Sequence, residues 1–411
     1  MTVTPENIKI ADFTYELPDS RIAKYPLEKR DQSKLLIYER GQIQEAVFFN
    51  LPEMLPHLSV LVRNNTKVIQ ARVEFTKSTG ARIEVFCLEP ADPPDYESNL
   101  GRSGSVSWYC LIGNAKKWKS GSLTRVINLE SEQLCLNAVR AESTDGKELV
   151  RFSWHPQEYS FSEILDQIGT TPIPPYLQRK AEPEDKSRYQ TLYALTNGSV
   201  AAPTAGLHFT PETERVISNR QIRISEITLH VGAGTFTPVK SKSIDQHLMH
   251  TEHIRVTRDT VHDLLNHGSF GITAVGTTSM RTLESLYWLG YLLKTGKAGL
   301  TGEIHIDQWL PYENSELVPV RKALLEILIQ MSVQELEFID FSTSLFIIPG
   351  YSFKLVDRLI TNFHQPGSTL LLLVAAFIGD DWRKIYNYAL NNDFRFLSYG
   401  DSCLLIRNKT D

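Results

Sequence analysis

ARIEVFCL at residues 81–88 and SVSWYCLI at residues 105–112 are rich in β-branched and aromatic side chains. Similar short runs, separated by Gly, Ser, Asp and Pro, continue from Val60 to about Ser153. Short strands between turn-forming residues are typical of antiparallel sheets that close on themselves. The sequence therefore predicts a small antiparallel β-barrel in this part of the chain.

The barrel is expected to be an insertion, because the segments on either side of it follow a different pattern. In SWHPQEYSFSEILDQIG, which follows it, Ser162 is placed to cap a short helix. A chain of 411 residues is also too long for one ordinary hydrophobic core. We expect a main domain formed by residues 1–62 and 154–411, interrupted by a barrel domain at residues 63–153.

The rest of the chain alternates strand-like and helical stretches, which predicts a mixed-sheet α/β main domain. The strand-like stretches are 222–230, 272–276 and 345–348, and the helical ones are 211–218, 278–293 and 320–331. Residues 171–190 are rich in Pro and charge, which predicts either a linker or a mobile lid.

Composition is that of an ordinary globular protein, with 42% apolar residues, 22% charged residues and a formal net charge of −5. Since this charge gives no general attraction to polyanions, contact with nucleic acid requires a local basic patch. Four widely spaced cysteines without a CxxC pair argue against a zinc ribbon or a disulfide scaffold. With no signal-peptide pattern and no apolar run near the roughly 20 residues that a bilayer requires, we expect a cytoplasmic protein without membrane contact.

GSVAAPTAGLHFT, from Gly198 to Thr210, is a first candidate for a ligand site. Its small residues allow the backbone to approach a ligand closely, and Pro203 stiffens the turn. His208 supplies a titratable ring and Phe209 a stacking face. The alternative is a tightly packed loop between a strand and a helix.

LHVGAGTF, residues 229–236, follows a strand-like run and places Gly232 and Gly234 where exposed amides bind a carboxylate or a phosphate. It lacks the third glycine of the dinucleotide fingerprint, so we expect no Rossmann cofactor site. His230 fits either a ligand contact or a core histidine.

HLMHTEH, residues 247–253, brings His247, His250, Glu252 and His253 together in the sequence. Substrate contacts or acid–base chemistry are the favoured interpretation. These residue types also bind zinc, which leaves a metal-dependent hydrolase as an alternative, but the spacing is not HExxH and we expect no metal.

GTTSMRTLES, residues 276–285, begins a helix after an apolar run, so Thr277, Thr278 and Ser279 are placed to bind an anion. For Arg281 and Glu284, three residues apart, a surface ion pair is the alternative. Polar residues within an otherwise apolar stretch are further candidates for ligand contacts: Tyr351, Lys354, Asn362 and His364.

The best candidate for nucleic-acid contact lies in the predicted barrel. Cations bind phosphates and indole rings stack on bases, a combination that suits single-stranded or looped RNA. A solvated hairpin is the alternative. The residues concerned are Lys116, Lys117, Lys119 and Arg125, interleaved with Trp108 and Trp118.

The motifs, in this order, resemble those of the S-adenosylmethionine:tRNA ribosyltransferase-isomerases of the queuosine pathway. The series runs from Asp12 to Ile406 and also includes DFTYELPDSRIAKYPLEKRDQSKLL, PGYSFKLVDRLITNFH and FRFLSYGD. The resemblance implies an α/β domain with an inserted β-barrel. It further implies that the ribosyl unit of S-adenosylmethionine moves onto 7-aminomethyl-7-deazaguanine at the wobble position of tRNA, with adenine and methionine released and epoxyqueuosine formed. We expect S-adenosylmethionine as donor substrate, tRNA as partner and a monomer.

Such a reaction needs a base beside the sulfonium and a donor that assists the departing adenine. The catalytic candidates are His208, His230, His250 and Glu252. The candidates for substrate binding are Ser199, Thr204, Gly206, Phe209, Gly232, Gly234, Thr235, Phe236, His247, Thr277, Ser279, Arg281, Tyr351, Lys354, Asn362 and His364. The candidates for tRNA binding are Arg63, Lys67, Arg72, Lys116, Lys117 and Lys119.

Several positions depart from the family's pattern. These are Asn65 in place of an acid, Lys67 in place of Arg, Gln70 in place of Pro, Thr237 in place of Arg and Gly367 in place of Lys. Fewer cations indicate an altered anion contact. The alternatives are therefore a paralogous transferase with a different base or RNA acceptor, and an RNA-binding relative without catalysis.

Overall fold

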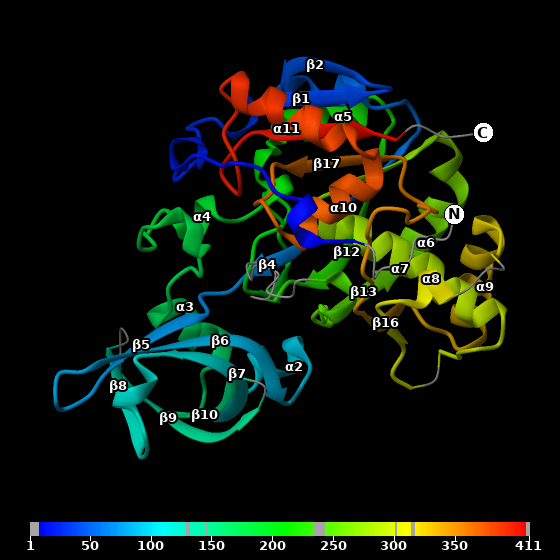
Figure 1. Ribbon diagram of the computed structural model, residues 1–411. Coiled ribbons are helices and arrows are strands. Elements are labelled where there is room, and N and C mark those ends of the chain that lie inside the picture. The colour runs from blue at the N-terminus through cyan, green and yellow to red at the C-terminus, as the bar shows by residue number, and fades with distance from the viewer. Residues whose placement is uncertain are drawn as a thin grey trace.

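The structure is a computed structural model that describes residues 8–128, 132–144, 146–232, 243–300, 302–313 and 317–407. These residues form sheets of ten, six and two strands (Figure 1). The prediction of a mixed-sheet α/β fold with an antiparallel barrel-like sheet is confirmed. Within the described residues, no helix combines the length and the apolar character needed to cross a bilayer.

The ten-stranded sheet has the order β15-β16-β13-β12-β3-β14-β17-β18-β1-β2. Its strands are β1 (Lys34–Glu39), β2 (Gln42–Val47), β3 (Val60–Asn64), β12 (Arg223–His230), β13 (Glu252–Thr257), β14 (Ile272–Val275), β15 (His305–Ile306), β16 (Phe338–Thr343), β17 (Arg358–Asn362) and β18 (Ser402–Ile406). β12, β3, β14 and β17 are mutually parallel, so their carboxyl ends lie at one edge. β3 and β14 are buried along their whole length, as expected of parallel strands covered on both faces.

Helices cover this sheet, and one of them, α7, is buried over almost its whole length. The α-helices of the described residues are α1 (Leu51–Met54), α2 (Tyr96–Gly101), α3 (Phe161–Ile168), α4 (Asp185–Arg188), α5 (Pro211–Asn219), α6 (Arg258–His267), α7 (Thr277–Lys294), α8 (Leu310–Glu313), α9 (Val320–Val333), α10 (Thr369–Ile378) and α11 (Asp381–Asn391). Of these, α2 and α3 pack instead into the core of the smaller, six-stranded sheet. α7 and α9 share one hydrophobic core with β12, β13 and β16. A helix that is buried on all sides cannot be amphipathic, which explains the Leu, Tyr and Trp residues around α7.

The six-stranded sheet has the order β5-β6-β7-β10-β9-β8 and is antiparallel throughout. Its strands are β5 (Arg72–Thr76), β6 (Arg82–Asp92), β7 (Ser105–Gly113), β8 (Ser122–Asn128), β9 (Gln133–Thr144) and β10 (Lys147–His155). Its edges approach each other, because Arg125 on β8 donates a hydrogen bond of 2.7 Å to the Glu74 carbonyl on β5. Figure 1 shows this sheet set apart from the larger one. The assignment of residues 63–153 to a separate barrel domain, and of residues 1–62 and 154–411 to the main domain, remains a proposal.

Two details of the sequence-based assignment are wrong. Residues 345–348 are buried but form no strand, and the strand before them is β16. The helix after the barrel is capped by Ser160 rather than Ser162, because the Ser160 hydroxyl accepts from the Glu163 amide and Glu163 bonds back to Ser160.

The segment 171–190, expected to be a linker or a lid, is held against the main body. Arg179 and Asp185 form an ion pair of 2.7 Å within it, and Tyr399 donates to Asp185 at 2.8 Å. Arg30 donates to the Gln190 carbonyl at 2.8 Å. Beyond this segment, β11 (Thr196–Ser199) pairs with β4 (Thr66–Val68) and leads into the motif that begins at residue 198.

Candidate functional site

A cavity of about 80 Å³ lies where β14 and β17 end and α7 begins. The edge formed by the carboxyl ends of parallel strands is a usual place for ligands in α/β proteins. We call it the α7 cavity. The residues that line it include Thr204, Val231, Thr277, Thr278, Asn362 and His364.

The first turn of α7 faces this cavity. Gly276 is its N-cap residue, and no side chain of the described residues caps this terminus. Unpaired amides and the helix dipole favour an anion there. Thr277 lines the cavity, whereas Ser279 is fully buried and its hydroxyl has no hydrogen-bond partner among the described residues.

His208 lies behind the cavity wall and is not among the residues that line the cavity. The residue is 4% exposed, with Nδ1 2.8 Å from Ser33 Oγ and Nε2 3.3 Å from Asn362 Nδ2. Burial lowers the pKa of His208 to about 4, so the ring is neutral at neutral pH. Asn362, which contacts both the ring and the cavity, accepts a hydrogen bond of 2.8 Å from Thr204.

His364 lines the α7 cavity from the turn after β17. Its Nε2 lies 2.8 Å from Thr361 Oγ1, and burial lowers the pKa of His364 to about 3. This ring is therefore also neutral and engaged in a hydrogen bond.

Arg281 lies one helical turn after Thr277 on the same face of α7, and it holds a buried carboxylate. Its Nη1 donates to Glu252 Oε2 at 3.0 Å, and the two side chains are 4% and 1% exposed. His250 Nε2 lies 3.2 Å from the other oxygen, Oε1, and this imidazole is 31% exposed. Burial alone would raise the pKa of Glu252, but Arg281 and His250 outweigh burial and hold the pKa below its usual value. The group thus combines a charged carboxylate with an accessible imidazole.

The alternative of a surface pair between Arg281 and Glu284 is wrong, because both side chains are buried. Glu284 instead accepts hydrogen bonds of 2.8 to 3.0 Å from the backbone amides of residues 354–356. Tyr351 donates to the same carboxylate at 2.9 Å. Tyr351 and Lys354, expected at the substrate, therefore belong to a loop anchored on Glu284. The sequence signal for this role is a carboxylate at the start of the apolar stretch of α7 that runs from Leu286 to Leu293.

A second cavity, of about 340 Å³, lies between α2 and the strands β12, β13 and β16, and we call it the His230 cleft. The His230 ring stacks on Tyr96 with centroids 4.1 Å apart and an interplanar angle of 12°. Burial and the neighbouring His253 lower the pKa of His230 to about 4. Gly198 has a φ of +136°, and a Cβ there would lie 2.6 Å from His230 Nδ1. The two glycine-containing motifs therefore meet at this ring.

HLMHTEH is divided between the buried Arg281–Glu252 pair and the His230 cleft. Successive side chains of a strand point to opposite faces, so Glu252 is buried against α7 while His253 is exposed and lines the His230 cleft. His247 packs beside Phe346, with ring centroids 5.6 Å apart. Across the part of the chain that the structure describes, no three His, Cys, Asp or Glu side chains are grouped to hold a metal ion.

Three predicted substrate contacts are packed into the interior. The Ser199 hydroxyl is fully buried and bonded to the backbone. Phe209 is 1% exposed and packs against Phe48 and Tyr193, and Gly206 is buried beside Tyr193. In this conformation Phe209 has no free face for stacking on a ligand.

Part of LHVGAGTF lies outside the described residues. Gly232 ends a described stretch that resumes at residue 243. The candidates Gly234, Thr235 and Phe236, and the departure at Thr237, fall between these limits.

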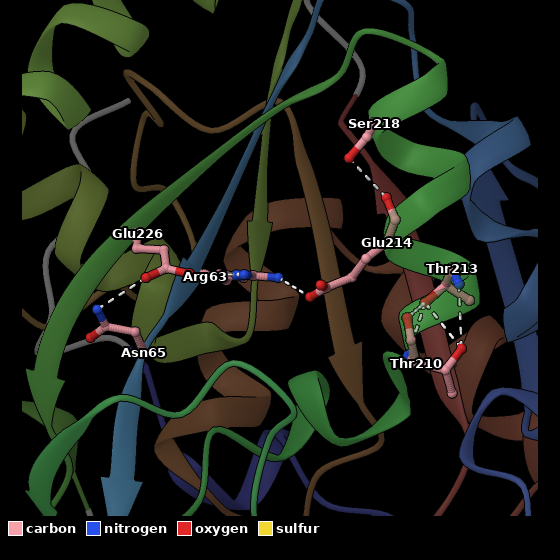
Figure 2. Close-up of polar contacts among 7 residues, drawn as sticks. All are labelled: Arg63, Asn65, Thr210, Thr213, Glu214, Ser218 and Glu226. Carbon is pink, nitrogen blue, oxygen red and sulfur yellow. Dashed lines mark hydrogen bonds and ion pairs between the residues drawn. The ribbon is translucent and has the colours of Figure 1, made fainter.

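Arg63 has an internal role rather than an exposed one. Figure 2 shows its guanidinium on β3 between Glu214 of α5 and Glu226 of β12. It forms ion pairs with both, the one to Glu226 at 2.8 Å, and it is 7% exposed. The ring of Tyr193 lies 3.9 Å away. Because its charge is already balanced, we leave Arg63 out of the proposed RNA surface.

The other expected RNA contacts divide into exposed lysines and core tryptophans. The exposed cations are Lys67, Lys116, Lys117 and Lys119, while Arg72 pairs with Glu84 at 2.6 Å. Trp108 and Trp118 are fully buried in the six-stranded sheet, so the expectation that they stack on bases is wrong. Large aromatic side chains fill this small core and leave the lysines as the exposed RNA-binding candidates.

Comparison with known proteins identifies the family to which this architecture belongs. Residues 10–405 match the family described as "Queuosine biosynthesis protein". The chain belongs to this family. It is 38% identical over 405 residues to the S-adenosylmethionine:tRNA ribosyltransferase-isomerase of Desulfitobacterium hafniense, covering 97% of this chain and 100% of the relative. The protein of the same name from Trichlorobacter lovleyi is 36% identical over 406 residues, covering 97% and 99%.

A solved structure is also similar to the chain. It is the crystal structure of S-adenosylmethionine tRNA ribosyltransferase from Thermotoga maritima, with 28% sequence identity and a TM-score of 0.45. The similarity covers 96% of this chain and 100% of that one.

Within the queuosine biosynthesis family, three departures of this chain lie in structural contacts or turns, while Lys67 is exposed. Asn65 Nδ2 donates to Glu226 at 3.2 Å, and Asn65 Oδ1 accepts from Thr228 at 2.8 Å (Figure 2 shows the first contact). Gln70 accepts from Thr171 at 2.9 Å. Gly367 adopts a φ of +65° in the turn before α10. None of these three residues lines the α7 cavity or the His230 cleft.

Proposed function

We propose that this chain transfers and isomerises the ribosyl unit of S-adenosylmethionine onto 7-aminomethyl-7-deazaguanine at the wobble position of tRNA, giving epoxyqueuosine-tRNA, adenine and methionine. The observation that carries the proposal is the arrangement on one face of α7. No described side chain caps the N-terminus of this helix. One turn further along, Arg281 pairs with the buried carboxylate of Glu252, which also contacts the accessible imidazole of His250. The names of the relatives support the same reaction.

The N-terminus of α7 is the candidate site for the carboxylate of the methionine portion. Its first-turn amides donate hydrogen bonds to an anion, and the helix dipole adds a favourable charge. Thr277 and Thr278 line the cavity at this point and supply hydroxyl groups. An 80 Å³ cavity holds such an end group rather than the whole donor.

His250 is the candidate for the base that removes a proton beside the sulfonium. A carboxylate only accepts hydrogen bonds, so the contact with Glu252 places the ring proton on Nε2 and leaves the lone pair on Nδ1. The same carboxylate stabilises the imidazolium that forms when the ring takes up a proton. Glu252 is buried and paired with Arg281, and we therefore assign it a positioning role.

The His230 cleft is the candidate site for the acceptor base. Its volume of about 340 Å³ suits a flat heterocycle, and its walls come from α2 and from the strands β12, β13 and β16 of the ten-stranded sheet. We place the reaction in the cytoplasm, where its tRNA substrate is found, and propose a monomer. The exposed lysines of the barrel are the candidate contacts for tRNA phosphates.

The test is incubation of the purified protein with S-adenosylmethionine and tRNA that carries the aminomethyl-deazaguanine. Released adenine is measured by chromatography, and the digested nucleosides by mass spectrometry. The proposal expects one adenine for each new nucleoside. Absence of both products would exclude it.

Two variants test whether His250 acts as the base. His250→Ala is expected to lose most turnover, since a positioned base contributes roughly 10²- to 10⁴-fold. The exposed His262 on α6 provides a matched control, and His262→Ala should keep wild-type rates. Adenine release with a different acceptor only would favour the paralogous transferase, and tRNA binding without adenine release would favour the non-catalytic relative.

A further inference from the structure

A chain of hydrogen bonds runs from the interior to the wall of the α7 cavity. Its members are Ser33, His208, Asn362 and Thr204, with successive distances of 2.8, 3.3 and 2.8 Å. His208 and Asn362 are 4% and 3% exposed. Ser33 is buried at the far end, while Thr204 is partly exposed and lines the cavity.

The backbone carbonyl of Asp401 decides how the Asn362 amide is oriented. This carbonyl lies 3.5 Å from Asn362 Nδ2, and a carbonyl only accepts hydrogen bonds. The amide nitrogen therefore faces Asp401 and His208, and the amide oxygen faces Thr204. Since the amide nitrogen only donates, Nε2 of His208 is the unprotonated acceptor and the ring proton lies on Nδ1, directed at Ser33.

The same orientation determines what Thr204 offers to a ligand. Its hydroxyl proton is used in the 2.8 Å bond to Asn362 Oδ1, so the oxygen presents only lone pairs to any further partner. We propose that this chain of bonds selects a substrate group that donates an N–H or O–H hydrogen bond to Thr204. His208 is then a positioning residue that fixes the polarity of the wall rather than a base.

The identity of the donating substrate rests on the proposed function. In that reaction the donor groups are the ribose hydroxyls and the two amino groups of S-adenosylmethionine, on its methionine and adenine portions, or the N–H groups of the acceptor base. Both substrates offer hydrogen-bond donors to Thr204. Binding of S-adenosylmethionine without tRNA and the KM for tRNA, measured separately, distinguish which substrate supplies the donor.

The tautomer of His208 is measured first, on the ligand-free protein, by nitrogen NMR of labelled histidine. The signal is assigned by its loss in His208→Asn. We expect a neutral ring with the proton on Nδ1 that does not titrate over roughly pH 5 to 8, where unperturbed histidines change charge. A ring protonated on Nε2, or one that becomes charged in this range, would overturn the proposal.

Thr204→Val and Thr204→Ser are then compared, because valine has nearly the shape of threonine without the hydroxyl and serine keeps the hydroxyl. Loss of one hydrogen bond predicts roughly a two- to tenfold weaker binding or higher KM for Thr204→Val, with Thr204→Ser close to wild type. Binding of S-adenosylmethionine is measured by calorimetry without tRNA, and KM for tRNA by adenine release.

Analogues of S-adenosylmethionine that lack one ribose hydroxyl or one of the two amino groups identify the partner atom. The analogue that lacks the group bound by Thr204 should bind the wild type more weakly than S-adenosylmethionine does. It should bind Thr204→Val about as tightly as S-adenosylmethionine does. If the loss of one S-adenosylmethionine group and the loss of the Thr204 hydroxyl have non-additive effects on affinity, the donor group belongs to S-adenosylmethionine. If Thr204→Val changes only the KM for tRNA, the donor group belongs to the acceptor base. If Thr204→Val matches Thr204→Ser in both arms, the proposal fails.

Failure of the proposed function gives a different pattern. Wild-type protein that binds S-adenosylmethionine but releases no adenine would contradict the proposed function. The tautomer of His208 and the calorimetric comparison of analogues with Thr204→Val would still decide the roles of His208 and Thr204.

Discussion

Replacing Arg281 with methionine is expected to destabilise the protein strongly, because it leaves a buried carboxylate without its cation. The Arg281 and Glu252 side chains are 4% and 1% exposed, and their nitrogen and oxygen lie 3.0 Å apart. Removing one partner of such a pair costs about 3 to 5 kcal/mol. This corresponds to roughly two to four powers of ten in the unfolding equilibrium.

The cost should depend on pH in a defined direction. In the wild type the pKa of Glu252 is held below its usual value, so the pair stabilises the fold above roughly pH 4.3, the ordinary pKa of Glu, and this contribution is lost as the pH falls further. In Arg281→Met, burial no longer has an opposing charge of comparable strength and raises the pKa of Glu252. The difference between the two proteins should therefore be largest at neutral pH and shrink as the carboxylate is protonated.

Urea unfolding followed by tryptophan fluorescence, over a series of pH values, measures both effects. Arg321→Met, at an exposed position of α9, is the matched control and should change stability by less than about 0.5 kcal/mol. Adding Glu252→Leu to Arg281→Met should recover part of the stability, since two apolar side chains replace an unpaired charge. A neutral-pH destabilisation no larger than the control's, or one that grows towards acid pH, would refute the reasoning.

Three further predictions concern other parts of the molecule. Gly198→Ala should cost about 1 to 3 kcal/mol in unfolding free energy by displacing the stacked imidazole beside it, measured by urea unfolding and by the NMR shifts of that ring. The triple variant Lys116→Ala, Lys117→Ala, Lys119→Ala should keep its melting temperature but bind tRNA more weakly, with a salt slope shallower by roughly 0.7 to 0.9 for each phosphate that a lysine no longer neutralises. Glu284→Gln should cost about 1 to 3 kcal/mol for each backbone amide left without an acceptor, and hydrogen exchange should be faster at residues 354–356.

The fold was largely predictable because its strands and helices have strong local patterns. Helices expected at 211–218 and 278–293 correspond to α5 and α7, and the β-rich region corresponds to the six-stranded sheet. The error at residues 345–348 has a physical cause. An apolar run signals burial, whereas a strand also needs a neighbour that accepts its backbone hydrogen bonds. Here the chain instead turns at Pro349 and Gly350, which has a φ of +95°.

The sequence located the regions of the site but not the role of each side chain. It indicated His208 as catalytic, yet the ring lies behind Asn362, which is 154 positions further along the chain. It offered a surface pair of Arg281 and Glu284 as an alternative to a ligand contact, yet their partners are Glu252 and the loop at 354–356. A motif records which residue types are present, while the distance of a side chain from a cavity depends on packing between distant segments.

The separation of the HLMHTEH side chains shows which features of the site can be predicted from the sequence and which cannot. Once residues 252–257 are assigned to a strand, the alternation of side chains alone separates Glu252 from His253 and removes the apparent metal cluster. No such rule predicts that Arg281, on a helix 29 positions away, faces the same carboxylate. That pairing, and with it the charge on Glu252 and the proton on His250 Nε2, follows only from how α7 packs across the sheet. The chemistry proposed for this face is therefore a property of the packed sheet and helix together, and changes to either should alter it.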